Sequence, residues 1–239
     1  MVYAAILAGG KGTRMGCDVP KQFLNVSGVP IIIHTLRRFV LSGMVDDTVV
    51  CVPGEYVEYT RELIAKYDDI SGAVSVTEGG ADRTGSLMNA CRFFAGKRPA
   101  SDDDVIITHD CVRPFINNEI IASGIAAARQ FGGATAAVPA VDTICVSHDG
   151  KVIDSVPDRS ALYSVQTPQT FMMKEFCELL YSLTEEEKAV ITDASAVLRL
   201  RGKPVAISLG SPSNIKITHP DDISVAESIM SKVINDNLS

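Results

Sequence analysis

The chain of 239 residues lacks the spacings that mark structural zinc sites and membrane spans. Its six cysteines are scattered with no Cys-x-x-Cys pair, and its four histidines form no cluster at zinc-ligand spacing. No apolar run approaches the roughly 18 residues that cross a bilayer, and the first apolar run has no charged segment before it. We therefore expect a protein with reduced thiols in the cytoplasm.

Excess positive charge is also missing. The net charge is −7, so a broad basic surface for nucleic acid is not expected, and an anion site must be a local basic pocket. Hydrophobic residues make up 46% of the chain, which is enough for one full core at this length. We find no internal repeat, linker or low-complexity tract and expect one domain over residues 1–239.

What is present is an alternation of apolar runs of strand length with segments of helical period. This pattern is typical of a mostly parallel sheet with helices on both faces, and predicts an α/β fold, a Rossmann-like three-layer sandwich. Ligands of such sheets bind beyond the carboxyl ends of the strands. The expected strands and helices are Val2–Leu7, Pro30–Leu41, Asp47–Val52, Glu55–Lys66, Ala73–Thr77, Arg83–Phe94, Asp104–Thr108, Asn118–Phe131 and Ala134–Pro139.

The pattern changes after Pro139. Two short β-prone runs, Asp142–Ser147 and Lys151–Val156, flank His148-Asp-Gly150, and Asp-Gly is typical of a hairpin turn. A lone hairpin buries too little surface to be stable, so we expect a protruding β-arm at about 141–163 that packs against a second subunit. Beyond it we expect helices at Lys174–Leu183, Asp193–Arg201 and Pro220–Ile234 and strands at Pro204–Leu209 and Asn214–Thr218.

The first expected strand runs into a glycine-rich loop with two cations. Three of the four residues Gly9–Gly12 are glycine, and Arg14 and Lys21 follow. Glycine lets backbone N–H groups approach an anion, and the cations can hold a polyphosphate. The loop lacks the Gly-Lys-Ser/Thr of a P-loop, and Met15 stands where a dinucleotide fingerprint has its third glycine. A nucleotide-phosphate loop is favoured, with a structural turn and solvated cations as the alternative.

The run Leu7-Ala-Gly-Gly-Lys-Gly-Thr-Arg-Met15 with Pro20-Lys-Gln22 resembles the signature of sugar-phosphate nucleotidylyltransferases. It is most similar to the cytidylyltransferases that use ribitol 5-phosphate or methylerythritol 4-phosphate. The resemblance implies an enzyme that joins CTP to a polyol phosphate, releases pyrophosphate and uses Mg²⁺. Five further motifs match that family in order: Gly79-Gly-Ala-Asp-Arg83, His109-Asp-x-x-Arg-Pro114, Asp142-Thr143, Thr167-Pro-Gln169 and Asn214-Ile-Lys-Ile-Thr218.

The resemblance also implies roles for individual residues. The catalytic residues would be those that stabilise charge at the α-phosphorus, namely Arg14, Lys21 and Lys216. The nucleotide would be bound by Leu7, Ala8, Gly9, Gly10, Gly12, Gly80, Asp82, Ser86 and Asp110. The polyol phosphate would be bound by Asp110 and Arg113 and, across the interface of a homodimer, by Thr143 and Arg159. Asp110 is also the candidate metal ligand.

Several of these residues have a simpler structural explanation. Asp82 or Ser86 can cap a helix without any ligand. Asp110 and Arg113 can form an ion pair that only ties a loop. His109 is expected to be structural, because the acceptor phosphate is already an anion at neutral pH and needs no general base.

The resemblance also bears on which polyol phosphate is used. Leu7-Ala-Gly-Gly10, Gln166–Phe171 and Thr192-Asp-Ala-Ser195 are closer to the ribitol 5-phosphate enzymes, which make CDP-ribitol for teichoic acid or related polymers. Ser195, where those enzymes often have cysteine, and Asp158-Arg159 are departures from that pattern. We expect ribitol 5-phosphate, with methylerythritol 4-phosphate, a substrate of isoprenoid biosynthesis, as the alternative.

Two functions of other classes are disfavoured. A non-catalytic nucleotide-binding module would be expected to lose the cations around the triphosphate, but Arg14, Lys21 and Lys216 are all present. A dinucleotide-dependent oxidoreductase would need the missing third glycine and an acidic residue at the end of the second strand.

Overall fold

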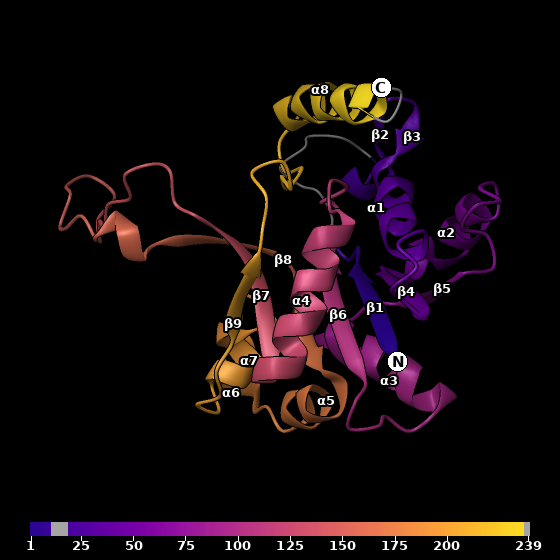
Figure 1. Cartoon of the computed structure of the whole chain (residues 1–239), viewed down its shortest axis with the longest axis horizontal. Helices are drawn as coiled ribbons and strands as arrows, with labels where there is room; N and C mark the ends of the chain where they lie inside the picture. The colour runs from indigo at the N-terminus through magenta and orange to yellow at the C-terminus, as the bar shows by residue number, and fades with distance from the viewer. Residues whose placement is uncertain (11–18, 237–239) are drawn as a thin grey trace.

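A computed structural model describes residues 1–10 and 19–236, with side chains to residue 232. Its centre is a seven-stranded sheet of order β5-β4-β1-β6-β8-β7-β9 (Figure 1). Six of its strands point in the same direction, whereas β8 runs opposite to them and pairs antiparallel with both β6 and β7. The strands are β1 Val2–Leu7, β4 Asp47–Val52, β5 Val74–Glu78, β6 Val105–Asp110, β7 Gly133–Pro139, β8 Tyr163–Met172 and β9 Ala206–Leu209.

Helices cover both faces of this sheet, which confirms the expected α/β sandwich. One core lies under α1 Ile31–Val40, α2 Val57–Ile64 and α4 Asn118–Phe131. The opposite core lies under α3 Arg83–Lys97, α5 Met173–Tyr181 and α7 Ala196–Arg199. Smaller elements in the described residues are β2 Asn25–Val26, β3 Val29–Pro30, α6 Glu185–Val190 and the short 3-10 helices η2 Lys21–Phe23, η3 Gly54–Tyr56 and η4 Arg159–Ala161.

The two cores follow from the alternation of side chains along buried strands. In β1, Ala4 and Ile6 belong to one core, whereas Tyr3 and Ala5 belong to the other. A strand covered on both faces therefore reads as one continuous apolar run. In the part of the chain that the structure describes, no helix is both long and apolar enough to cross a membrane.

A third, smaller core forms beyond the carboxyl ends of the strands. The last helix, α8 Asp221–Asp236, lies across this edge beside β2 (Figure 1). Ala226 and Met230 of α8 pack with Val26, Val112 and Ile217. This packing fixes the segment before α8 over the edge of the sheet where ligands are expected.

Several expectations about local structure are wrong. β8 was not expected as a strand, Asn214–Thr218 is not a strand, and only Ala196–Arg199 of the expected helix at Asp193–Arg201 is an α-helix. The two strands of the expected β-arm do not form either. The segment 140–162 extends away from the sheet (Figure 1), but its two limbs share a single antiparallel bridge between Val146 and Ser155.

The hairpin turn at the tip of that segment is held by side chains instead of a strand ladder. The Asp149 carboxylate accepts hydrogen bonds from the backbone N–H groups of Lys151 and Val152, at 2.8 and 3.0 Å. Gly150 adopts a φ of 71°, a conformation that glycine takes without strain. The Asp-Gly signal therefore marked a turn, but the runs beside it do not pair as strands.

Candidate active site

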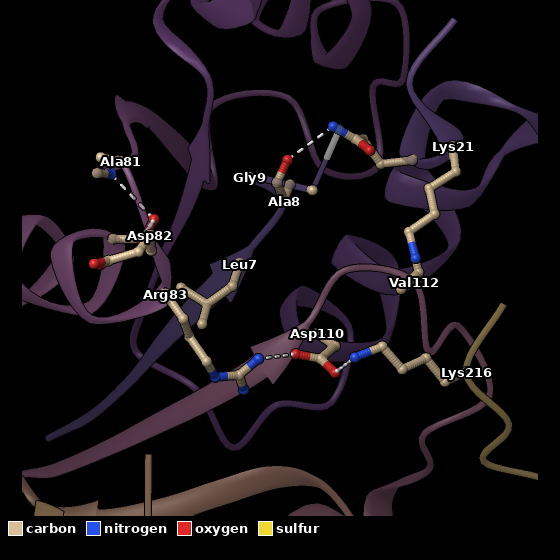
Figure 2. A pocket seen from close by; sticks show the side chains of 14 residues that line it. Leu7, Ala8, Gly9, Lys21, Ala81, Asp82, Arg83, Asp110, Val112 and Lys216 are labelled. Carbon is tan, nitrogen blue, oxygen red and sulfur yellow. Dashed lines mark hydrogen bonds and ion pairs between the residues drawn. The ribbon is translucent and has the colours of Figure 1, made fainter. Parts of the chain in front are cut away.

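A cavity of about 260 Å³ lies at the carboxyl ends of β1 and β6 (Figure 2). β1 and β6 are parallel neighbours with Leu7 beside Asp110, so the residues that follow each strand meet at one edge of the sheet. The lining residues are Leu7, Ala8, Gly9, Gly10, Lys21, Gln22, Gly80, Ala81, Asp82, Arg83, Ser86, Asp110, Val112 and Lys216. The structure thus brings together most of the residues that the sequence proposed for the nucleotide and for catalysis.

One wall of the cavity is the start of the glycine loop. The Gln22 side chain is buried and donates a hydrogen bond of 2.8 Å from Nε2 to the Ala8 carbonyl. Its neighbour Lys21 donates from Nζ to the Ile217 carbonyl at 3.2 Å. These bonds tie η2 to the end of β1 on one side and to the 214–218 segment on the other. Gly12 and Arg14 lie outside the described residues.

The opposite wall is the turn that starts α3. Asp82 caps the helix, because its Oδ1 accepts from the Gly85 N–H at 2.6 Å. Ser86 Oγ donates to the Asp82 carbonyl at 2.9 Å and accepts from the Gly80 N–H at 3.0 Å. A Cβ atom on Gly80 would lie 2.4 Å from the Gly85 carbonyl carbon, so no larger residue fits this turn. Capping accounts for Asp82 and Ser86, and both also line the cavity.

Between these walls, one carboxylate is surrounded by three cations. Asp110 Oδ1 lies 2.7 Å from Arg83 Nη1, and Asp110 Oδ2 lies 2.8 Å from Lys216 Nζ and 3.8 Å from Arg113 Nε. Burial would raise the pKa of Asp110, but the charges of Arg83 and Lys216 outweigh it and hold that pKa well below its usual range. The group stays ionised and leaves an excess of positive charge, which suits an anionic ligand.

A second cavity of about 220 Å³ lies on the other side of Asp110. It shares Arg83, Asp110 and Lys216 with the first cavity, and its remaining lining residues are Arg113, Val165, Gln166, Thr167, Gln169, Thr192 and Asp193. Arg113 is oriented by a hydrogen bond of 2.8 Å from Nη1 to the Asn214 carbonyl. Asp110 and its cations therefore stand between two adjoining cavities.

Two expected substrate-binding residues do not reach either cavity of their own chain. Thr143 and Arg159 lie on the extended 140–162 segment, and both are exposed. Arg159 Nη1 donates to the Val141 carbonyl at 3.0 Å, a contact within the segment itself. Any contact of these two residues with a ligand would have to be made in another copy of the chain.

Comparison with known proteins identifies the family. The family model of 2-C-methyl-D-erythritol 4-phosphate cytidylyltransferase (IspD) matches residues 2–232. The chain belongs to this family. Two ribitol-5-phosphate cytidylyltransferases of Streptococcus pneumoniae, from strains Spain 23F-1 and D39, are 42% and 43% identical to it over 234 residues, which cover 97% of this chain and 100% of theirs. These relatives are nucleotidyltransferases, and so is this cytidylyltransferase.

Solved structures agree with that placement. The 4-diphosphocytidyl-2C-methyl-D-erythritol synthase of Anaerococcus prevotii has a TM-score of 0.78 and 26% identity, covering 96% of this chain and 98% of that one. The 2-C-methyl-D-erythritol 4-phosphate cytidylyltransferase of Thermus thermophilus has a TM-score of 0.73 and 26% identity over the same shares. The family resemblance that the six motifs indicated is confirmed.

His109 of this cytidylyltransferase faces the protein interior. Its ring is buried 5.0 Å from the Phe39 ring, and its Nε2 lies 3.0 Å from the Arg113 carbonyl. Burial lowers the pKa of His109 to about 4. A neutral ring that donates from Nε2 fits this environment, which supports the structural role expected for His109.

Sequence reasoning assigned no ligand-binding or catalytic role to several residues that shape the site. Arg83 was visible in the Gly-Gly-Ala-Asp-Arg motif but was given no role. Thr167 Oγ1 accepts from the Asp110 N–H at 3.0 Å, and Asn214 Nδ2 donates to the Thr167 carbonyl at 2.8 Å. Both belong to motifs that the resemblance had singled out, and both act by fixing the backbone around Asp110.

The donor set around Asp110 does not by itself fit a magnesium ion. Among residues 1–10 and 19–232, no group of three acidic, histidine or cysteine side chains is placed to hold a metal. Both Asp110 oxygens already contact cations, at 2.7 and 2.8 Å. Mg²⁺ takes oxygen ligands in octahedral geometry, and these side chains alone do not supply them.

Proposed function

We propose that this cytidylyltransferase joins CTP and D-ribitol 5-phosphate to give CDP-ribitol and pyrophosphate. The observation that carries the proposal is the position of Asp110, Lys216 and Arg83 between two adjoining cavities. Two substrates that bind in those cavities would meet at this cluster of charges. The relatives that share 42% and 43% identity over their whole length are named for ribitol 5-phosphate, which supports this acceptor.

The first cavity would take CTP. Leu7, Ala8, Gly9, Gly10 and Gly12 would offer backbone groups to the triphosphate, and Arg14 and Lys21 would neutralise its charge. Gly80, Asp82 and Ser86 would contact the cytosine and ribose from the opposite wall, and Asp110 would border the sugar. The separation of the two walls supports this division, because Lys21 lies on one wall and the capping groups of Asp82 and Ser86 lie on the other.

The second cavity would take the polyol phosphate. Arg113 lines it, with a guanidinium held in place by the Asn214 carbonyl. An oxygen of the acceptor phosphate would attack the α-phosphorus of CTP in line. A new bond forms between that oxygen and the α-phosphorus. The bond between the α-phosphorus and the oxygen that bridges it to the β-phosphorus breaks, and pyrophosphate leaves. Because the acceptor is already an anion, no general base and no covalent enzyme intermediate are required.

Catalysis would then rest on positioning and on cations close to the α-phosphorus. Lys21 and Lys216 approach from two segments that a hydrogen bond ties together, and Arg14 would complete the set. Preorganised charges of this kind stabilise a phosphoryl transition state without rearrangement at the moment of reaction. Mg²⁺, with Asp110 as its candidate ligand, remains a prediction, and the triphosphate oxygens would have to supply most of its ligands.

We further propose that the enzyme is a cytoplasmic homodimer joined through the 140–162 segment. This segment exposes apolar side chains, with Val141 81%, Val152 64% and Ile153 63% exposed. A partner copy that covers them would gain hydrophobic stabilisation, and could bring Thr143 and Arg159 to the acceptor phosphate. CDP-ribitol made here would serve teichoic acid or related polymers in cell wall biogenesis.

A substrate comparison tests the proposal. Pyrophosphate release is measured with CTP and Mg²⁺, with either D-ribitol 5-phosphate or 2-C-methyl-D-erythritol 4-phosphate as the acceptor. We expect strong turnover of the ribitol compound. The methylerythritol compound is the second candidate because the family model and the solved neighbours carry its name; turnover of it alone would reverse the assignment.

A further inference from the structure

Arg83 is the first residue of α3, and its side chain borders both cavities. We propose that Arg83 is a positioning residue of the transfer reaction: it holds the Asp110 carboxylate between the two cavities and so leaves Lys216 available to the reacting phosphate. The inference rests on the proposed cytidylyl transfer and adds to it a residue that neither binds the triphosphate nor touches the α-phosphorus.

The first support is the division of the Asp110 carboxylate between two cations. Oδ1 is taken by Arg83 Nη1 at 2.7 Å and Oδ2 by Lys216 Nζ at 2.8 Å. Arg83 and Lys216 approach the carboxylate from opposite sides (Figure 2). The backbone of Asp110 is fixed independently, because its N–H donates to Thr167 Oγ1 at 3.0 Å. The carboxylate can still rotate about the side-chain bonds of Asp110. The ion pair with Arg83 holds Oδ1 and so opposes a rotation that would bring it toward Lys216.

The second support is what would follow if Arg83 were absent. The Asp110 carboxylate is buried, with 9% of its side chain exposed, and a buried ionised oxygen without a partner is costly. Oδ1 would therefore turn toward the nearest remaining cations, Lys216 and Arg113. A Lys216 ammonium that faces both carboxylate oxygens is less able to bind a phosphate oxygen. Arg83 thus acts on Lys216 through Asp110.

The third support separates this role from a purely structural tie. The start of α3 is already secured by the Asp82 cap and by the close approach of Gly80 to Gly85. In the described part of the chain, Arg83 Nε is buried without a hydrogen-bond partner. The guanidinium is tied to Asp110 through Nη1, whereas the start of α3 is held by other groups, so the ion pair is not what secures the helix.

The test compares Arg83→Gln with Arg92→Gln, a matched change on the same helix. Arg92 contacts Asn89 at 3.1 Å and lines neither cavity. We expect Arg83→Gln to lower kcat for pyrophosphate release by about 10²-fold, a size typical of a misplaced catalytic group. The Kd for CTP, measured by calorimetry, should change by less than about threefold. Arg83→Lys should recover part of kcat, and Arg92→Gln should behave as the wild type.

Two outcomes of these measurements would overturn the proposal. An unchanged kcat in Arg83→Gln would show that the residue does not position anything needed for transfer. A Kd for CTP weakened as much as kcat/KM would make Arg83 a ligand of the nucleotide. Circular dichroism and thermal unfolding of each variant show whether it is folded. If Arg83→Gln does not fold, the same comparison is made with Arg83→Lys.

A second measurement does not depend on turnover. Reductive methylation of Lys216, followed by peptide mass spectrometry, should be slower in Arg83→Gln than in the wild type, because Asp110 then pairs more fully with the ammonium. In an Asp110→Asn background, Arg83→Gln should have no such effect. Equal rates in the wild type and Arg83→Gln, or the same slowing in both backgrounds, would overturn the proposal. If the wild type turns over neither polyol phosphate, the proposed function fails, and this labelling result alone decides on Arg83.

Discussion

Lys21 and Ile217 are 196 residues apart in the chain, yet the Lys21 ammonium donates a hydrogen bond of 3.2 Å to the Ile217 carbonyl. Ile217 is buried, and its own N–H donates to the Val112 carbonyl at 2.9 Å. Its neighbour Lys216 reaches Asp110 across the same cavity. The first and the last motif of the family are therefore parts of one wall. The bonds between them fix the positions of Lys21 and Lys216 relative to each other.

We predict that Lys21→Ala abolishes pyrophosphate release and leaves the fold intact. Removing one preorganised donor from a charged transition state costs on the order of 10²–10³ in kcat, and Lys21 would also neutralise the triphosphate. Activity is followed by pyrophosphate release and folding by circular dichroism. Lys66→Ala, a change at an exposed lysine after α2, is the matched control. Retained turnover in Lys21→Ala would remove this lysine from the mechanism.

We predict that Gly80→Ala weakens CTP binding strongly, because an added Cβ would meet the Gly85 backbone at 2.4 Å. The turn that carries Asp82 and Ser86 would have to shift. Gly96→Ala is the matched control. Gly96 lies in α3, the helix that follows this turn, with open space around it, and alanine there should be neutral or stabilise the helix by about 0.5–1 kcal/mol. Calorimetry of CTP binding checks both. Equal affinities in the two variants would mean that the turn does not contact the nucleotide.

The strands and helices with strong local signals were predictable from the sequence. β1 has the expected bounds, because a run buried on both faces is apolar at every position. α4 also has the expected bounds. Asn117 caps its first turn, where its Oδ1 accepts a hydrogen bond of 3.0 Å from the Ile120 N–H, and Gly132 ends the helix at a φ of 87°. In both cases the signal lies within the segment itself.

β8 was missed because its stability comes from distant contacts. The strand carries Gln166, Thr167 and Gln169, residues that give no apolar run, and the chain meets Pro168 in its middle. Its buried polar groups are satisfied elsewhere: Gln169 Oε1 accepts from the Ala194 N–H at 2.9 Å, and Gln166 Oε1 accepts from Asn214 Nδ2 at 3.1 Å. No local pattern reveals such partners. The family motifs located the site, whereas the role of this strand can be recognised only in the folded structure.

We predict that His109 makes the protein less stable as the pH falls below about 6.5. Burial lowers the pKa of His109 from 6.5 to about 4 in the folded state. Between these values the unfolded chain binds the proton and the native chain does not, so the free energy of unfolding decreases as the pH falls, by at most about 1.4 kcal/mol per pH unit. Below about pH 4 both states are protonated and this contribution has been lost.

Urea unfolding of the wild type and His109→Gln at pH 7 and pH 5 measures this effect. The variant should be less stable at pH 7, because the ring packs on Phe39, but its stability should change less between the two pH values. His34 also has its pKa lowered by burial and is present in both proteins, so the difference in slope isolates His109. Equal slopes would show that burial does not lower the pKa of His109 in the folded protein.

The exposed segment 140–162 leads to a prediction about shared active sites. Thr143 and Arg159 lie too far out to line either cavity of their own chain, so the acceptor phosphate would meet Arg159 only in a partner copy. We predict that Arg159→Ala and Lys21→Ala are each inactive alone and regain activity when mixed. In the mixed dimer, one of the two sites receives an intact Lys21 from one chain and an intact Arg159 from the other, so recovery of up to about half of the wild-type rate per heterodimer is expected. Heterodimers are confirmed by differently tagged chains and sedimentation, and heterodimers without activity would count against a shared site.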